Sequence, residues 1–272
     1  MDCYYIIHSG FPTTFKYNVR HTDPRFFYFS SILGLVVHMY KKRIMVKRHK
    51  YVCNDFADSD VIWKYYKLSR FLDLLDQQKL FFTRVDKFSD FNEFPVTERD
   101  AKLFNMSLDE CKSEFERIKR QAFVNCWRID VNESFGMWSA YSDIETGIAI
   151  KTTVRNLIAA CSEKENDRDI TIGKVHYIDD QSDGGQMLGM PLNTGYIIFS
   201  KIKPYEYENE LRLYFEDWEN REKEYLCIDV NLQILIEEIR VSAGSHPLYA
   251  RMVDSLLKEK GIDVPVVRSI IK

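Results

Sequence analysis

Hydrophobic and polar positions are patterned most clearly between residues 69 and 93. Apolar residues at 71, 72, 74 and 75 follow the spacing of one helix face, so the pattern predicts a helix over 69–79 with Ser69 as its cap. The strand-like run 80–84 then ends abruptly at Arg84, and carboxylates interleave with aromatic rings beyond it. We expect a helix, a strand and a charged turn in that order, with the strand delivering polar side chains to a cleft.

From residue 97 onward, helical and extended patterns alternate in short segments. The predicted helices are 97–121 (as one or two helices), 134–141, 154–161, 196–201, 231–238 and 247–260. The predicted strands are 123–127, 147–151, 174–178, 210–215, 224–230, 239–243 and 264–268. We expect 224–230 to pair with 210–215, Thr152 and Thr153 to cap the helix at 154, and the glycine-containing segment 179–193 to form a lid or a mobile surface loop. Short strands with helices inserted between them predict an α+β domain whose mixed central sheet is mostly antiparallel.

The first fifty residues differ from the rest of the chain. Residues 26–40 form an almost uninterrupted apolar and aromatic run, which at 15 residues is shorter than the roughly 20 that span a bilayer. We expect an N-terminal extension over 1–50, packed on the core or poorly ordered, and a single α+β domain over 51–272. Because lysines and arginines follow the apolar run, an arm that binds a membrane surface or a partner is the alternative.

Composition narrows the class of protein further. The 272 residues are 45% hydrophobic, which is enough to bury a sizeable core, and the net charge of -3 gives no strong nucleic-acid signal. The six cysteines are scattered without a CxxC pair, so we expect neither a disulfide framework nor a zinc site, and we expect a reducing cytoplasmic location. The acceptor or substrate, the oligomeric state and the partners stay open.

Four blocks of sequence resemble a bacterial family, domain of unknown function 2971. The blocks are Leu80–Glu93, Val124–Trp127 with Glu133–Tyr141, Gly147–Thr153 and Tyr207–Leu213. The resemblance runs from about Trp63 to Lys272. Because the family name carries no biochemistry, it implies a fold more than a function.

The order of segments is also similar, more weakly, to that of ADP-ribosyltransferases. That resemblance implies NAD as a co-substrate, with Glu210 as the key carboxylate and Glu208 beside it. It further implies that Arg84 binds the pyrophosphate and that Trp138 or Tyr141 stacks on nicotinamide. The chain departs from the pattern because it lacks a Ser-Thr-Ser block on the second strand.

Two other functions and one structural interpretation compete with transfer from NAD. A nuclease or hydrolase that uses Mg²⁺ would bind the metal through carboxylates and orient water with Lys201 or Lys203. A non-catalytic module would bind a ligand or partner without turnover. In the structural interpretation, Arg84 and Arg212 pair with the carboxylates, Trp138 packs in the core, and Asp90 and Glu93 cap a turn. The predicted cleft residues are Arg84, Asp86, Asp90, Glu93, Trp138, Tyr141, Glu208, Glu210 and Arg212.

Overall fold

The computed structural model describes residues 4–7, 15–18, 46–48, 55–88, 96, 98–163, 168–178 and 198–271. The chain divides into two compact units, residues 1–42 and 43–272. In the first unit, strands β1 (Tyr4–Ile7) and β2 (Phe15–Asn18) pair in antiparallel fashion. The apolar run 26–40 and the predicted loop 179–193 lie outside the described residues.

A ten-stranded mixed sheet forms the centre of the second unit and confirms the predicted α+β class. Its strands are β3 (Val46–Arg48), β4 (Val61–Tyr66), β5 (Lys79–Arg84), β6 (Ala122–Ile129), β7 (Ile148–Thr153), β8 (Ile170–Lys174), β11 (Glu210–Glu216), β12 (Tyr225–Asp229), β13 (Glu238–Val241) and β14 (Val266–Arg268). The order is β14-β13-β7-β4-β6-β11-β8-β3, and β5 joins β6 to β12 beside this path. The pairs β13–β14 and β3–β8 are parallel, whereas the others are antiparallel. Strand β3 lies within the stretch predicted as the N-terminal extension.

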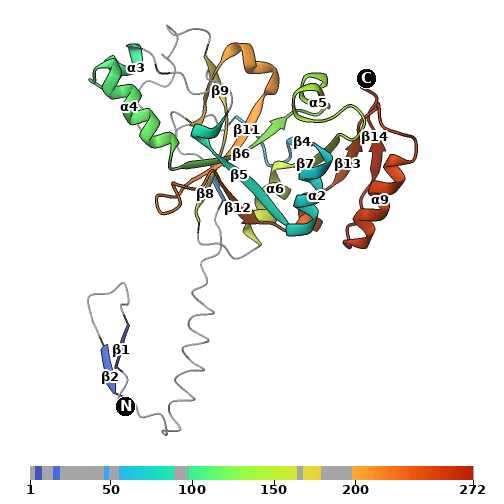
Figure 1. The fold of residues 1–272 in the computed structure, drawn as a ribbon, viewed down its shortest axis with the longest axis horizontal. Coiled ribbons are helices and arrows are strands. Elements are labelled where there is room, and N and C mark those ends of the chain that lie inside the picture. The colour runs from blue at the N-terminus through green and yellow to red at the C-terminus, as the bar shows by residue number, and fades with distance from the viewer. Residues whose placement is uncertain are drawn as a thin grey trace. The chain divides into compact units, whose positions relative to one another are not determined.

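Helices cover both faces of this sheet. They are α2 (Leu68–Gln77), α3 (Glu98–Leu103), α4 (Leu108–Lys119), α5 (Phe135–Tyr141), α6 (Val154–Ser162), α8 (Leu232–Leu235) and α9 (Tyr249–Glu259), with 3-10 turns η1 (Val85–Lys87) and η2 (Lys203–Glu208). Helix α9 lies beside β13 and β14 at one end of the sheet, and α3 and α4 lie at the opposite end (Figure 1).

Local sequence explains most helix boundaries. Ser107 and Glu110 form a reciprocal capping box at the start of α4, and Thr153 accepts from the main chain of Asn156 at the start of α6, as predicted for that helix. The predicted cap of α2 is wrong, because the helix begins one residue before Ser69 and its N-cap, Lys67, makes no side-chain cap. The helix ends where Gln78 takes a left-handed conformation with φ of 54°.

Three predicted strand and helix assignments are corrected by the sheet. Strand β12 pairs with β5, because both edges of β11 are already occupied by β6 and β8. Ser200 and Lys201, predicted as helical, belong to strand β10 (Ser200–Ile202). The single strand predicted over 174–178 is divided: β8 ends at Lys174, and β9 (His176–Ile178) pairs in parallel with β10 in a separate sheet.

The described residues form three hydrophobic core clusters. The largest lies between one face of the sheet and helices α2, α6, α8 and α9. On the opposite face, α3 and α4 cover residues such as Val124 and Tyr214, and α5 covers Trp63 and Tyr65. Strand register places Cys126 and the carboxylate-bearing start of β11 on this second face, between the two smaller clusters.

Candidate functional site

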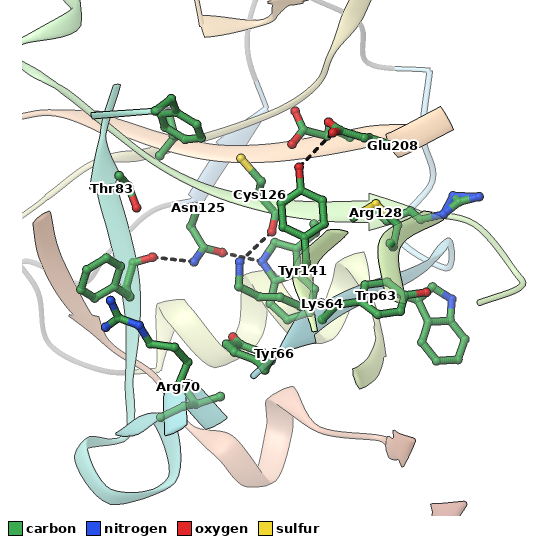
Figure 2. Close-up of a pocket in the computed structure, with 18 of the residues that line it drawn as sticks. Trp63, Lys64, Tyr66, Arg70, Thr83, Asn125, Cys126, Arg128, Tyr141 and Glu208 are labelled. Atoms are coloured by element: carbon green, nitrogen blue, oxygen red, sulfur yellow. Dashed lines mark hydrogen bonds between the residues drawn. The ribbon is translucent and has the colours of Figure 1, made fainter. Parts of the chain in front are cut away.

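Strand β6 shares one of its edges between two different strands. β4 pairs with Arg128 and Ile129 at one end, and β5 pairs with Phe123 and Val124 at the other. Residues 125–127 have no ladder partner on that edge among the described strands. The sheet therefore opens into a fork, and a cavity of about 510 Å³ lies at this opening (Figure 2).

Side chains replace the ladder hydrogen bonds inside the fork. The ammonium of Lys64 donates to the main-chain carbonyl of Cys126 at 2.7 Å. The amide of Asn125 donates to the main-chain carbonyl of Phe81 at 2.8 Å and accepts from the indole of Trp127 at 2.7 Å. Figure 2 shows these contacts converging on the cavity. Buried main-chain carbonyls need such partners, so the bridges hold the fork open without leaving these carbonyls unpaired.

Two carboxylates enter the cavity from the junction of η2 and β11. Glu208 ends the 3-10 turn, Glu210 begins the strand, and Asn209 between them is left-handed with φ of 41°. Asparagine tolerates this conformation better than most residues, and its side-chain amide also donates to the carbonyl of Ile129. This turn directs both carboxylates into one cavity, which both of them line.

Glu210 is buried and held by cations. The guanidinium Nε of Arg212 donates to Glu210 Oε2 at 2.8 Å, and the Cys126 thiol contributes a further hydrogen bond. Burial alone would raise the pKa of Glu210, but the charges of Arg212 and Lys201 outweigh it and place that pKa below its usual range. Glu210 is therefore an anion at neutral pH.

Glu208 is the more basic of the two carboxylates. Its Oε2 lies 2.6 Å from the ammonium of Lys201, and its Oε1 accepts from the hydroxyl of Tyr141 at 2.9 Å (Figure 2). Burial, together with the negative charge of Glu210, raises the pKa of Glu208 above its usual range despite Lys201. Burial and Glu208 likewise raise the pKa of the Tyr141 phenol, so Tyr141 is a hydrogen-bond donor here. Two adjacent carboxylates with opposite pKa shifts provide an anion and a proton acceptor in one cavity.

Lys64 is a second unusual group in the cavity. Alternation places it on the face opposite Trp63, and it reaches the cavity through the fork. Its ammonium lies 5.7 Å from the ring centre of Tyr66 and 5.5 Å from that of Trp127. Burial lowers the pKa of Lys64 to about 8, although the Cys126 thiol and Glu210 act in the opposite direction.

The structure brings together only part of the predicted cleft. Glu208, Glu210 and Tyr141 line the cavity. Arg212 does not line it, but its guanidinium donates to the carboxylate of Glu210. Arg84 does not line the cavity: it lies on the same face of β5 as the core residue Phe82. Its guanidinium donates to both carboxylate oxygens of Asp86 (2.5 and 3.0 Å).

The remaining predicted residues also lie away from the cavity or outside the described chain. Main-chain carbonyls of Arg221 and Lys223 complete the contacts of Arg84, so the Arg84–Asp86 pair fixes a turn and does not face Glu210. Trp138 packs edge-on against Tyr65 with ring centres 5.1 Å apart, as the structural interpretation predicted. The predicted positions of Asp90 and Glu93 fall outside the described residues.

Sequence reasoning missed several residues that line the cavity. Lys64, Arg70 and Cys126 line the cavity (Figure 2), and none of them was among the predicted cleft residues. A signal for Lys64 does exist, because a lysine interrupts the apolar strand 61–66. Arg70 carried no comparable signal, since an arginine in the first turn of an amphipathic helix is ordinarily a solvated residue.

Neither a known family model nor a curated protein matches the chain. The resemblance to domain of unknown function 2971 therefore stays a prediction. Within the described ranges, no group of three or more His, Cys, Asp or Glu residues is placed to hold a metal ion. No helix in the described part of the chain is long and apolar enough to cross a membrane.

Proposed function

We propose that the protein cleaves the N-glycosidic bond between nicotinamide and ribose in NAD, its candidate co-substrate, and transfers the ADP-ribosyl group to an acceptor. The observation that carries this proposal is the pairing of Glu208 and Glu210, whose pKa values are shifted in opposite directions within one aromatic-lined cavity. A reaction that builds positive charge on a sugar and takes a proton from an acceptor needs these two groups.

Glu210 provides the negative charge. As nicotinamide leaves with the electrons of the glycosidic bond, positive charge develops on the ribose. An ionised carboxylate already fixed by Arg212 stabilises that charge without reorganisation during the reaction. The depressed pKa of Glu210 keeps it ionised across the physiological range.

Glu208 takes the proton of the acceptor. When an acceptor hydroxyl or amine forms its bond to the ribose carbon, its proton must leave, and a carboxylate with a raised pKa is the better base near neutral pH. Tyr141 holds one oxygen of Glu208 and Lys201 the other, so the carboxylate is positioned by two partners. The products are nicotinamide, the ADP-ribosylated acceptor and a proton held by Glu208.

In the proposal, Tyr141 lies next to the leaving group, whereas Arg84 and Trp138 have no role. Tyr141 is 43% exposed, lines the cavity and donates its hydroxyl hydrogen bond to Glu208, so its ring is placed to contact nicotinamide. The binding of phosphate must use cations that line the cavity.

Replacement of Glu210 by Gln tests the proposal. We expect NAD turnover, measured as nicotinamide release, to fall about a hundredfold or more, because shape is kept and charge is lost. Glu216→Gln, an exposed carboxylate at the other end of β11, is the matched control and should keep the parent rate. Equal turnover in Glu210→Gln and the parent would refute the assignment.

The Glu210→Gln change also leaves the buried guanidinium of Arg212 without its carboxylate. Breaking a buried pair destabilises a protein by about 3–5 kcal/mol, so the fold must be checked by circular dichroism. Glu210→Asp keeps the charge and moves the carboxylate back by one methylene. This second variant should stay folded, bind NAD and react more slowly than the parent. Parent protein that binds NAD without releasing nicotinamide would favour the non-catalytic module instead.

A further inference from the structure

The cavity carries more positive than negative side chains. Five basic residues line it, namely Lys64, Arg70, Lys79, Arg128 and Lys201, against the three carboxylates Asp73, Glu208 and Glu210. Lys201 pairs with Glu208, Lys79 with Asp229 and Arg128 with Asp130. Arg212, which does not itself line the cavity, forms an ion pair with Glu210. In the described part of the chain, this leaves Lys64 and Arg70 without an ion pair.

Arg70 is the more accessible of these two cations. It projects from the first turn of α2, is exposed, and its guanidinium lies 4.7 Å over the ring centre of Phe81. The ring supports the flat guanidinium, and none of the ion pairs within the described chain occupies its donors. An arginine held in this way is suited to bind phosphate through two parallel hydrogen bonds. Asp73, on the same helix, accepts from the amide of Gln77.

A second cavity of about 390 Å³ adjoins the first at Arg70. It is lined by Ser69, Arg70, Asp73, Gln77, Phe81, Tyr225 and Cys227. Arg70, Asp73 and Phe81 line both cavities, so they form the wall between them. Figure 2 shows Arg70 and Glu208 at opposite sides of the first cavity. A ligand that reaches from the carboxylates to the second cavity therefore passes Arg70.

The second cavity offers an aromatic surface beyond this wall. Tyr225 stacks on Phe81 with ring centres 4.4 Å apart and an angle of 25° between the rings, yet it is 53% exposed. The pairing comes from the β5–β12 register, in which Phe81 lies opposite Cys227 and Thr83 opposite Tyr225. A tyrosine fixed by one stacking partner and open to the cavity is a platform for a second flat ring.

We propose that the two cavities together bind one dinucleotide-like ligand, with a phosphate group on Arg70 at the shared wall and its second base against Tyr225. The inference rests on the proposed function, because it places the reacting ribose beside Glu210 in the first cavity. It transfers to Arg70 the phosphate-binding role that the resemblance to ADP-ribosyltransferases implied for Arg84. Lys64 adds positive potential to the first cavity but is not the phosphate ligand.

Binding of ADP-ribose tests the proposal without requiring turnover. We expect Arg70→Gln to weaken ADP-ribose binding, measured by calorimetry, about tenfold to a hundredfold, because charge-assisted hydrogen bonds to phosphate are lost. Binding of adenosine, which has no phosphate, should change less than threefold. Tyr225→Ala should weaken both ligands, since both carry the base.

Arg117→Gln is the matched control. The guanidinium of Arg117, on helix α4, lies 5.0 Å from the ring centre of Trp218, which resembles the arrangement of Arg70 over Phe81. Arg117 differs because it is paired with Glu114 and lines neither cavity. This variant should bind ADP-ribose as the parent does. Equal losses in Arg70→Gln and Arg117→Gln, or no ADP-ribose binding by the parent, would overturn the proposal.

The outcome separates this proposal from that for catalysis. If Arg70→Gln weakens ADP-ribose binding while Glu210→Gln still releases nicotinamide at the parent rate, the dinucleotide site stands and the catalytic assignment fails. If Glu210→Gln abolishes turnover but Arg70→Gln binds ADP-ribose normally, the catalytic assignment stands and the phosphate site is refuted. Inorganic pyrophosphate that binds as tightly as ADP-ribose and loses as much affinity in Arg70→Gln would also refute the dinucleotide proposal, because it would identify a plain phosphate site.

Discussion

The ammonium of Lys64 donates to the carbonyl of Cys126 across the gap where β4 leaves β6, and no carboxylate of the described chain forms an ion pair with it. A charge in this position destabilises the fold whenever it is present, because burial separates it from water. The cavity therefore holds a positive charge that lowers the stability of the folded protein, a cost that is common at functional sites.

Lys64→Met should raise the free energy of unfolding at pH 7 by about 1–2 kcal/mol, the gain from removing the charge exceeding the lost hydrogen bond. Because the pKa of Lys64 is lowered to about 8, its ammonium group loses a proton above pH 8 in the native parent. In the unfolded chain the same group stays protonated until about pH 10. Parent stability therefore rises between those values, and the advantage of the variant shrinks. Urea unfolding at pH 7 and pH 9.5 measures both. If the extra unfolding free energy of Lys64→Met did not change with pH, the assigned burial of the Lys64 charge would be wrong. Lys258→Met, at an exposed site on α9, is the control.

Arg84→Ala should destabilise the protein by about 2–4 kcal/mol, because Asp86 and two main-chain carbonyls lose their donor in a buried setting. The Michaelis constant for NAD should stay within about twofold of the parent value, since Arg84 does not line the cavity and its guanidinium is held by Asp86. Thermal unfolding and initial rates provide the two measurements. A large rise in the Michaelis constant with normal stability would return Arg84 to the phosphate role.

Asn125→Ala should lower the free energy of unfolding by about 2–4 kcal/mol, since it leaves the carbonyl of Phe81 and the indole of Trp127 unpaired in the buried fork. Asn156→Ala removes one exposed hydrogen bond to Glu237 and should cost less than about 1 kcal/mol. Chemical denaturation of both variants gives the comparison. Similar small losses would show that the side-chain bridges do not support the fork.

Tyr141→Phe should raise the pKa of Glu208 further, because the lost hydrogen bond favours the charged carboxylate. If Glu208 acts as the base, it must be deprotonated, so the acidic limb of the activity profile should move to higher pH. Titration of ¹³C-labelled glutamate carboxyl groups by NMR measures the pKa independently of turnover. Tyr66 lines the same cavity without touching Glu208, so the control Tyr66→Phe should leave the titration of Glu208 unchanged. A fall in the pKa of Glu208 would contradict the assigned hydrogen bond.

Local periodicity was sufficient to predict the fold class and most elements, because their boundaries depend on nearby residues. The predicted strand 210–215 alternates in sequence, and the register of β11 against β6 places Leu211 and Leu213 on the face opposite Glu210 and Arg212. Pairing partners could not be predicted in the same way, since β12 joins a strand about 140 residues earlier in the chain and nothing in either segment specifies that choice.

The site was predictable only where a residue stands out within its own short segment of sequence. Glu208, Glu210 and Tyr141 were identified because carboxylates flanking a strand and an aromatic helix stand out locally. Arg84 was misplaced because the chemistry of a side chain does not reveal which sheet face it occupies in an unknown register. The fork depends on how β4 and β5 share β6, a tertiary feature that leaves no trace in any one segment.

The division of the β6 edge also has a mechanical consequence. The arm that contains β4 and β7 and the arm that contains β5 and β12 have β6 as their common strand neighbour in the described sheet. The side-chain bridges of Lys64 and Asn125 span the opening in place of ladder hydrogen bonds, so any change in its width must stretch or release them. Two side chains therefore set the spacing of the arms at the cavity, whereas main-chain ladders set it elsewhere along β6.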